Sequence, residues 1–185
     1  NEINKKELNR ILRKINGTYC CILFNPMLNQ VHFVTDFLGF FPAYLYQDDE
    51  LTIISSEIKF FKLFDNINLG LDQEAIYSYL HNGHLMLGQT WYQEIKRTRP
   101  ASIYTLNLNN GSIKNEYYWT WADVRKRKLP KEEIIETYAK LFTKGIEELN
   151  LPSKTRIAIS LSGGLDSRWI AQIASKKFDI DAFTF

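Results

Sequence analysis

A serine- and glycine-rich turn near the end of the chain constrains its fold more than any other feature. The turn, residues 162–167, reads Ser-Gly-Gly-Leu-Asp-Ser and follows a short apolar run at 156–161. A helical pattern at 167–177 comes after it, and a second apolar run occupies 180–185. This order predicts a strand, a helix and a second strand, which usually form a parallel, right-handed βαβ unit. The turn then lies where α/β proteins bind anions, between the carboxyl end of a strand and the start of a helix.

Each residue of the turn suits a polyphosphate. Gly163 and Gly164 let the backbone approach phosphate oxygens and adopt positive φ, and the hydroxyls of Ser162 and Ser167 add donors to the free helix amides. A carboxylate here repels phosphate unless a cation intervenes, so we interpret Asp166 as a ligand of a phosphate-bound magnesium ion. The turn is not a Walker A loop, because it lacks the G-x-x-x-x-G-K-[ST] spacing and has no lysine. Simple turn and cap roles are the alternative.

The complete string S-G-G-L-D-S after an apolar strand resembles the pyrophosphate loop of ATP pyrophosphatases. These enzymes cleave ATP to AMP and pyrophosphate while they adenylate a substrate, so the resemblance implies adenylation rather than γ-phosphoryl transfer. It implies that ATP and Mg²⁺ bind here, with Asp166 holding the metal ion through the phosphate. The implied nucleotide-binding positions are Leu161, Ser162, Gly163, Gly164, Leu165, Asp166, Ser167 and Phe185. For Leu161 and Phe185, plain strand core is the alternative.

The preceding part of the chain carries a different pattern. Short runs rich in Val, Ile, Phe and Tyr alternate with turn residues, which predicts antiparallel strands at 18–24, 30–35, 43–47, 51–55, 102–108 and 113–119. The Asn-Gly pair at 110–111 predicts that the last two strands form a hairpin. Helical spacing predicts helices at 57–64, 72–80 and 131–149, with Asp72 as the N-cap of the second.

Three stretches of this part, 16–24, 35–44 and 55–59, resemble the class II glutamine amidotransferase domain of asparagine synthetases. Further matches follow in the family's order at 80–83, 90–92 and Pro100. The resemblance implies an α+β fold, the back half of an αββα Ntn-type amidotransferase with antiparallel strands, followed by the start of a parallel α/β ATP-pyrophosphatase domain. We therefore expect an amidotransferase-like domain at 1–121, a linker at 122–130 and a synthetase-like domain at 131–185.

In the resembled family, an N-terminal cysteine hydrolyses glutamine, and the ammonia attacks an adenylated aspartate. The resemblance implies a glutamine-dependent, asparagine synthetase-like ligase whose substrates are ATP, glutamine, and aspartate or a related acid. The chain begins with Asn1, so we interpret it as a fragment that lacks the catalytic nucleophile and has no glutaminase activity alone. Cys20 and Cys21 do not replace that nucleophile. They are neighbours in a predicted strand, point to opposite faces and are interpreted as packing residues.

Two departures from the family pattern leave the acceptor substrate open. Thr35 and Arg168 stand where family members usually carry an arginine and a second serine, respectively. A guanidinium at position 168 suits a phosphate or an acidic substrate, and a solvent-facing helix position is the alternative. Ligases of the β-lactam synthetase or lasso-peptide cyclase type, and a non-catalytic amidotransferase-like module, therefore stay open.

Composition and spacing argue against several other classes of function. The net charge is only +2, so we expect no nucleic-acid partner and interpret the basic run at 125–131 as a linker. No apolar run reaches the length of about 18 residues that spans a bilayer, so we expect no membrane partner. His81 and His84 lack nearby acidic or cysteine ligands and do not predict a zinc site, and the aromatic run at 117–121 is assigned to packing. We expect a cytoplasmic protein, and a homodimer stays open.

Overall fold

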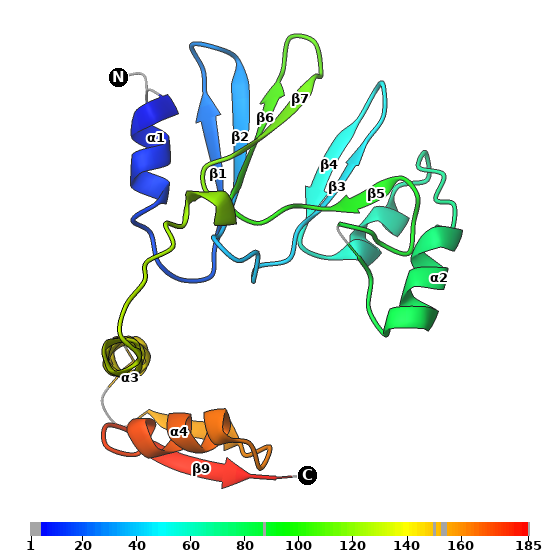
Figure 1. The fold of residues 1–185 in the computed structure, drawn as a ribbon. Helices are drawn as coiled ribbons and strands as arrows, with labels where there is room; N and C mark the ends of the chain where they lie inside the picture. Colours follow the sequence, from blue (N-terminus) through cyan, green and yellow to red (C-terminus); the bar gives the residue numbers. More distant parts are fainter. Residues whose placement is uncertain (1–4, 87, 150, 153–154, 185) are drawn as a thin grey trace. The chain divides into compact units, whose positions relative to one another are not determined.

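The structure is a computed structural model that describes residues 5–86, 88–149, 151–152 and 155–184. The chain divides into two compact units, Asn1–Arg125 and Lys126–Phe185 (Figure 1). The division falls inside the segment predicted as a linker, and the identity of the two domains stays a prediction. The first unit contains α1 (Lys5–Leu12), β1 (Cys20–Asn25), β2 (Gln30–Thr35), β3 (Tyr44–Gln47), β4 (Thr52–Ser55), the 3₁₀ helix η1 (Ile58–Leu63), α2 (Gln73–Asn82), β5 (Ile95–Arg97), β6 (Ser102–Asn107), β7 (Ile113–Tyr117) and the 3₁₀ helix η2 (Trp121–Asp123).

Two antiparallel sheets form the first unit. One has the strand order β1-β2-β6-β7 and the other the order β4-β3-β5. The predicted hairpin is confirmed, because β6 and β7 pair antiparallel with Leu106 opposite Ile113. Gly111 in its turn has a φ of 70°, which explains the preference for glycine there.

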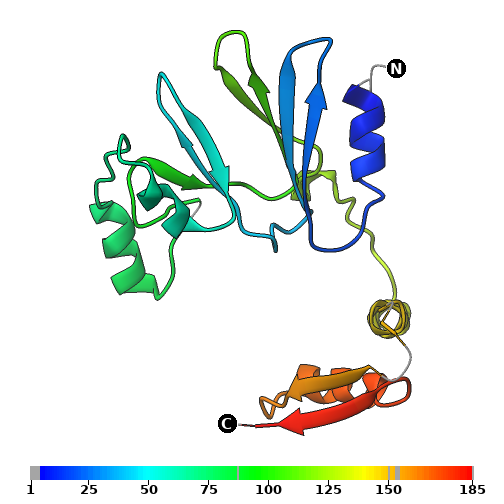
Figure 2. The same cartoon turned by 180° about the vertical axis from the view of Figure 1, so that it is seen from behind.

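Alternate residues of the strands pack into different layers, as the period of two in a strand requires. In β2, Val34 joins a cluster with Leu12 of α1, whereas its neighbour Phe33 joins a second cluster that includes residues of both sheets. In β3, Leu45 packs against that second cluster, and Tyr46 joins a third with Phe61 of η1. The layers are therefore helix, sheet, sheet and helix, with α1 beside the four-stranded sheet (Figure 2). This is the mixed fold with antiparallel sheets that the sequence predicts.

Some predicted elements differ from the structure. Segment 57–64 is a short 3₁₀ helix, η1, rather than a longer regular helix, and α1, β5 and η2 were not predicted. The helix at 72–80 is confirmed as α2, with the Asp72 carboxylate accepting a hydrogen bond of 3.0 Å from the Ala75 amide. Gly83 ends this helix in the left-handed conformation, with a φ of 74°.

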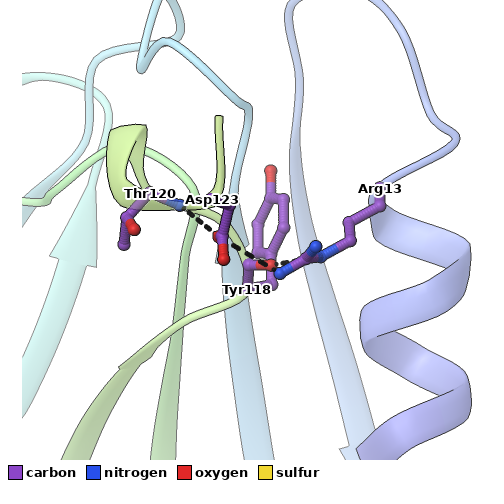
Figure 3. A network of polar contacts seen from close by, with 4 residues as sticks. All are labelled: Arg13, Tyr118, Thr120 and Asp123. Carbon is purple, nitrogen blue, oxygen red and sulfur yellow. Dashed lines mark hydrogen bonds and ion pairs between the residues drawn. The ribbon is translucent and has the colours of Figure 1, made fainter. Parts of the chain in front are cut away.

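A polar network ties the end of α1 to η2 (Figure 3). Arg13 Nε donates to the Tyr118 carbonyl oxygen at 2.7 Å, and Arg13 Nη2 lies 3.3 Å from Asp123 Oδ2. Asp123 Oδ2 also accepts from the Thr120 amide at 2.9 Å, which caps η2. The guanidinium therefore fixes the helix against the segment through which the chain leaves the first unit.

We expect Arg13→Ala to lower the free energy of unfolding of the first unit by about 1 kcal/mol, because one charge-assisted hydrogen bond and a half-exposed ion pair are lost. Urea denaturation of the variant and the wild type measures this difference. Arg10→Ala is the matched control, since among the described residues Arg10 forms only an exposed pair with Glu7 in the same helix, and its loss should cost no more than about 0.5 kcal/mol. An equal cost for both variants would contradict a stabilising role of the network.

The second unit contains α3 (Lys131–Glu147), β8 (Arg156–Ser160), α4 (Leu165–Ala174) and β9 (Asp179–Phe183). Strands β8 and β9 pair in parallel, with Ile157 opposite Ile180, and α4 connects them, so the predicted strand, helix and strand are confirmed. Helices α3 and α4 contact each other through the stacked rings of Phe142 and Trp169, whose centroids are 4.4 Å apart. None of the helices in the described ranges combines the length and apolar character that a membrane crossing requires.

Candidate functional site

The serine- and glycine-rich loop joins β8 to α4 in the second unit. The Leu161 amide donates to the Phe183 carbonyl oxygen at 2.8 Å, so the parallel pairing continues past Ser160 and the loop begins at Ser162. Gly163 has a φ of 77°, and a Cβ atom built on it would meet nothing within 4 Å. The backbone at Gly163 is therefore left-handed and open to an approaching ligand.

The start of α4 carries unused hydrogen-bond donors. Gly164 is the N-cap residue and provides no side-chain cap, so the first amides of the helix have no side-chain partner among the described residues. Ser162 Oγ lies 3.3 Å from Ser167 Oγ and 3.4 Å from the Gly164 amide nitrogen. These distances are long for hydrogen bonds of a hydroxyl, so both hydroxyls can turn toward a stronger acceptor. An anion at this helix end would meet amides, hydroxyls and the positive end of the helix dipole.

Two charged side chains flank the loop. Asp166 lies in the first turn of α4 and is exposed. Arg168 follows it, and its Nε donates to the Gly164 carbonyl oxygen at 3.1 Å. This bond holds the guanidinium at the loop and leaves its two terminal nitrogens available for a ligand. The structure thus brings together the residues at 162–168 that the sequence singled out.

The donor set at the loop fits a magnesium ion carried on a phosphate better than a metal held by protein alone. Within the described ranges, no group of three or more His, Cys, Asp or Glu side chains is placed to hold a metal ion. Magnesium keeps several waters and binds proteins through one or two carboxylates plus substrate phosphates. Asp166, phosphate oxygens and water would complete such a site, and this assignment stays a prediction.

The structure gives less support to the other three residues that were predicted to bind the nucleotide. Leu161 is half-buried, and its amide is already used in the sheet, so only its carbonyl oxygen is available to a ligand. Leu165 is exposed at the first position of α4. Phe185 lies outside the described residues. These three assignments stay predictions.

Cys20 and Cys21 lie in β1 on opposite faces of the four-stranded sheet. Cys21 packs against the cluster beneath α1, and Cys20 packs against the cluster between the two sheets. Both are half-buried and free, and burial raises the pKa of the Cys20 thiol. A raised pKa lowers the thiolate fraction and hence the reactivity. The packing role predicted for both cysteines is therefore confirmed.

A buried aspartate organises the turn between β2 and β3. Asp36 Oδ1 accepts from the amides of Leu38 at 3.1 Å and Phe40 at 3.0 Å, and Oδ2 accepts from the Phe41 amide at 2.9 Å. Burial on its own would raise the pKa of Asp36, but these backbone hydrogen bonds together lower it. In the sequence, the stretch at 35–44 carries only a family resemblance. The Asp-x-x-Gly spacing was the signal for its structural role, because Asp commonly accepts from amides a few residues ahead.

Thr35, which stands where the resembled family usually carries arginine, is buried beside this turn. Its hydroxyl donates to the Arg99 carbonyl oxygen at 2.7 Å and accepts from the Ser102 amide at 3.0 Å. The hydroxyl therefore joins β2 to the start of β6, and the departure from the pattern has a structural use.

A cavity of about 680 Å³ lies in the first unit and was not predicted from the sequence. Its walls come from the turn after β2, from the segment between α2 and β6, and from the chain around η2. Trp119 and Trp121, members of the aromatic run assigned to packing, belong to these walls. The two rings do pack on each other, with centroids 4.9 Å apart, and they also face the cavity.

Comparisons with known proteins add family evidence to this geometry. A family model described as a glutamine amidotransferase domain matches residues 4–119. The chain is 25% identical to an asparagine synthetase (glutamine-hydrolysing) 2 named in Methanocaldococcus jannaschii, with 91% of this chain and 33% of that protein covered. It is also 25% identical to the glutamine-hydrolysing asparagine synthetase 2 of Bacillus subtilis, over 92% of this chain and 24% of that protein. The chain thus spans about a third or less of these relatives.

A solved structure, the glutamine phosphoribosylpyrophosphate amidotransferase of B. subtilis complexed with ADP and GMP, superposes with a TM-score of 0.37 and 11% identity. The alignment covers 96% of this chain and 35% of that one.

Proposed function

The chain belongs to the glutamine amidotransferase domain family, and on this premise we propose that the protein is a glutamine-dependent, amide-forming ligase of the asparagine synthetase type. In this proposal the first unit is an Ntn-type amidotransferase region and the second begins an ATP-pyrophosphatase domain. ATP adenylates aspartate or a related carboxylate, and ammonia from glutamine then forms the amide. The named relatives support the glutamine-dependent part, and the loop at 162–167 supports the ATP-dependent part.

The residues of the loop have separate roles in this proposal. The first amides of α4 and the hydroxyls of Ser162 and Ser167 bind the oxygens of the pyrophosphate group, and Gly163 gives that group room to approach the backbone. A magnesium ion bound with ATP neutralises phosphate charge, and Asp166 holds it. Arg168 is placed to meet either a phosphate or the acidic acceptor. The tight contact with pyrophosphate makes it a good leaving group during adenylation.

One observation carries the proposal. The loop combines a left-handed Gly163 facing open space with a helix start that has no side-chain cap, in a chain with family relatives named as asparagine synthetases. A turn that served only to connect β8 and α4 would gain stability from a capping side chain, which Gly164 does not provide.

Exchange of labelled pyrophosphate into ATP by the purified full-length gene product tests the proposal. We expect magnesium-dependent exchange that needs aspartate, because the reverse of adenylation requires an acyl-adenylate. ATP binding without aspartate-dependent exchange would move the acceptor to another acid, as in ring-closing ligases. Absence of ATP binding would instead favour a non-catalytic amidotransferase-like module and contradict the ligase proposal.

A ring-closing or other amide-forming ligase is the second candidate function. The observation that favours it is Arg168, where asparagine synthetases usually carry serine, held against the loop by its bond to the Gly164 carbonyl oxygen. A guanidinium at this place offers a second anion-binding group beside the pyrophosphate site. Exchange assays with a panel of carboxylic acids separate the two candidates.

A further inference from the structure

The cavity of the first unit has an aromatic wall. Phe37 and Trp119 have ring centroids 5.3 Å apart, and Trp119 and Trp121 have centroids 4.9 Å apart, so the three rings form a continuous surface. Trp121 is 74% exposed even though it contacts Trp119. Trp91 lines the cavity as well. Exposed tryptophan faces of this kind are suited to stacking against a flat ring.

The cavity also has a positive charge. Arg97 and Arg99 line it, and the described lining residues include no Asp or Glu. Arg97 Nη2 makes one long contact of 3.4 Å with the Gly39 carbonyl oxygen. The Arg99 guanidinium has no hydrogen bond or ion pair with the residues that the structure describes. Two exposed arginines that share a cavity without a carboxylate leave their charge to an outside anion.

Hydrogen bonds fix the backbone at the positions from which the two arginine side chains leave the chain. The Arg97 amide donates to the Gly88 carbonyl oxygen at 2.9 Å, and the Arg99 amide donates to the Tyr104 hydroxyl at 2.8 Å. Gly39 packs so closely on Pro100 that a Cβ atom would lie 3.3 Å from its side chain. The volume of about 680 Å³ lies in the range of small-molecule sites.

We propose that this cavity binds a small anion that carries a flat ring, with the ring against Trp119 and Trp121 and the anionic group on Arg97 and Arg99. A nucleoside phosphate and an aromatic carboxylate share this chemistry. All lining residues belong to the first unit, whereas the loop at 162–167 belongs to the second. The proposal does not depend on the proposed ligase activity.

Tryptophan fluorescence during titration with AMP or with phenylacetate tests the proposal, because three of the four tryptophans line the cavity. We expect saturable binding of at least one probe, and the probe that binds more tightly identifies the anionic group as phosphate or carboxylate. The double variant Arg97→Gln/Arg99→Gln should bind about tenfold or more weakly, since two charge-assisted contacts are lost.

Two controls make the result specific. Arg125→Gln/Arg127→Gln removes the same charge from exposed positions outside the cavity and should bind as the wild type does. Trp169→Phe, which removes the one tryptophan of the second unit, should give the same signal change, which assigns the signal to the tryptophans of the first unit. Unchanged circular dichroism and thermal unfolding of each variant confirm that it is folded. The proposal is overturned if neither probe saturates at millimolar concentration, or if the Arg97 and Arg99 variant binds as tightly as the wild type.

Discussion

Replacing Asp166 with alanine is expected to lower the rate of ATP/pyrophosphate exchange by at least about 100-fold, the usual order for loss of one group that stabilises charge in a transition state. In the proposed site this carboxylate is the protein's ligand to magnesium, and without it the metal ion has only phosphate and water to hold it beside the loop. The side chain is exposed and packs against nothing in the core, so the fold should be unaffected. Exchange rates at saturating ATP and Mg²⁺ measure the effect.

Asp179→Ala is the matched control for this variant. Asp179 is an exposed carboxylate of the same unit, but it begins β9 and lies opposite Arg156 in the strand register, at the end of the sheet away from the loop. Its removal changes the net charge by the same amount and should leave exchange within about twofold of the wild type, as expected for a surface change that touches no ligand. Equal losses in both variants would show a general charge effect and remove Asp166 from the site.

Asp36→Ala is expected to lower the free energy of unfolding of the first unit by about 3 kcal/mol or more, from three hydrogen bonds to a charged acceptor. The carboxylate is 1% exposed and accepts from the amides of Leu38, Phe40 and Phe41. Alanine leaves these amides without their acceptor in the turn. Urea denaturation at pH 7 measures the difference. Asp65→Ala, at an exposed position outside the elements, is the control and should change the free energy by less than about 0.5 kcal/mol.

The same aspartate predicts an acid-dependent loss of stability. The folded pKa of Asp36 lies below its ordinary value of 3.8, so the folded state favours the ionised form. Its contribution is fully present above the unfolded pKa and is lost as the pH falls through the folded pKa. The stability difference between wild type and Asp36→Ala should therefore be constant near neutral pH and shrink below about pH 4. A difference that grows on acidification would contradict the assignment of the ionised carboxylate.

The sequence predicts the sheets better than the short elements. Strand β2 has the predicted bounds. The Asn-Gly turn at 110–111 specifies the hairpin of β6 and β7, because the turn chemistry and the apolar pattern agree. Strand β5 has only three residues, too few to show a period of two. Helix α1 carries Leu8 and Leu12 on the core side, a spacing typical of a helix, but two apolar positions are too few to predict it. Over the six residues of η1, periodicity does not separate a 3₁₀ helix from an α-helix.

The two candidate sites differ in how much of each can be predicted from the sequence. The loop at 162–167 is contiguous, so its glycines, serines and carboxylate can be read together with the strand and helix around them. The cavity is assembled from Phe37, Arg97 and Trp119, which are far apart in the chain and are brought together by the pairing of β2 with β6 and β6 with β7 in one sheet and of β3 with β5 in the other. No single window of the sequence contains that pattern.

Calorimetric titration of the protein with ATP, with and without magnesium, measures nucleotide binding without assuming an acceptor substrate. We expect one saturable binding event in the presence of Mg²⁺ that weakens at least about tenfold when the metal is removed, since Asp166 then repels the phosphates. Binding that is unchanged or stronger without magnesium, or no binding in either condition, would contradict a pyrophosphate site at the loop between β8 and α4.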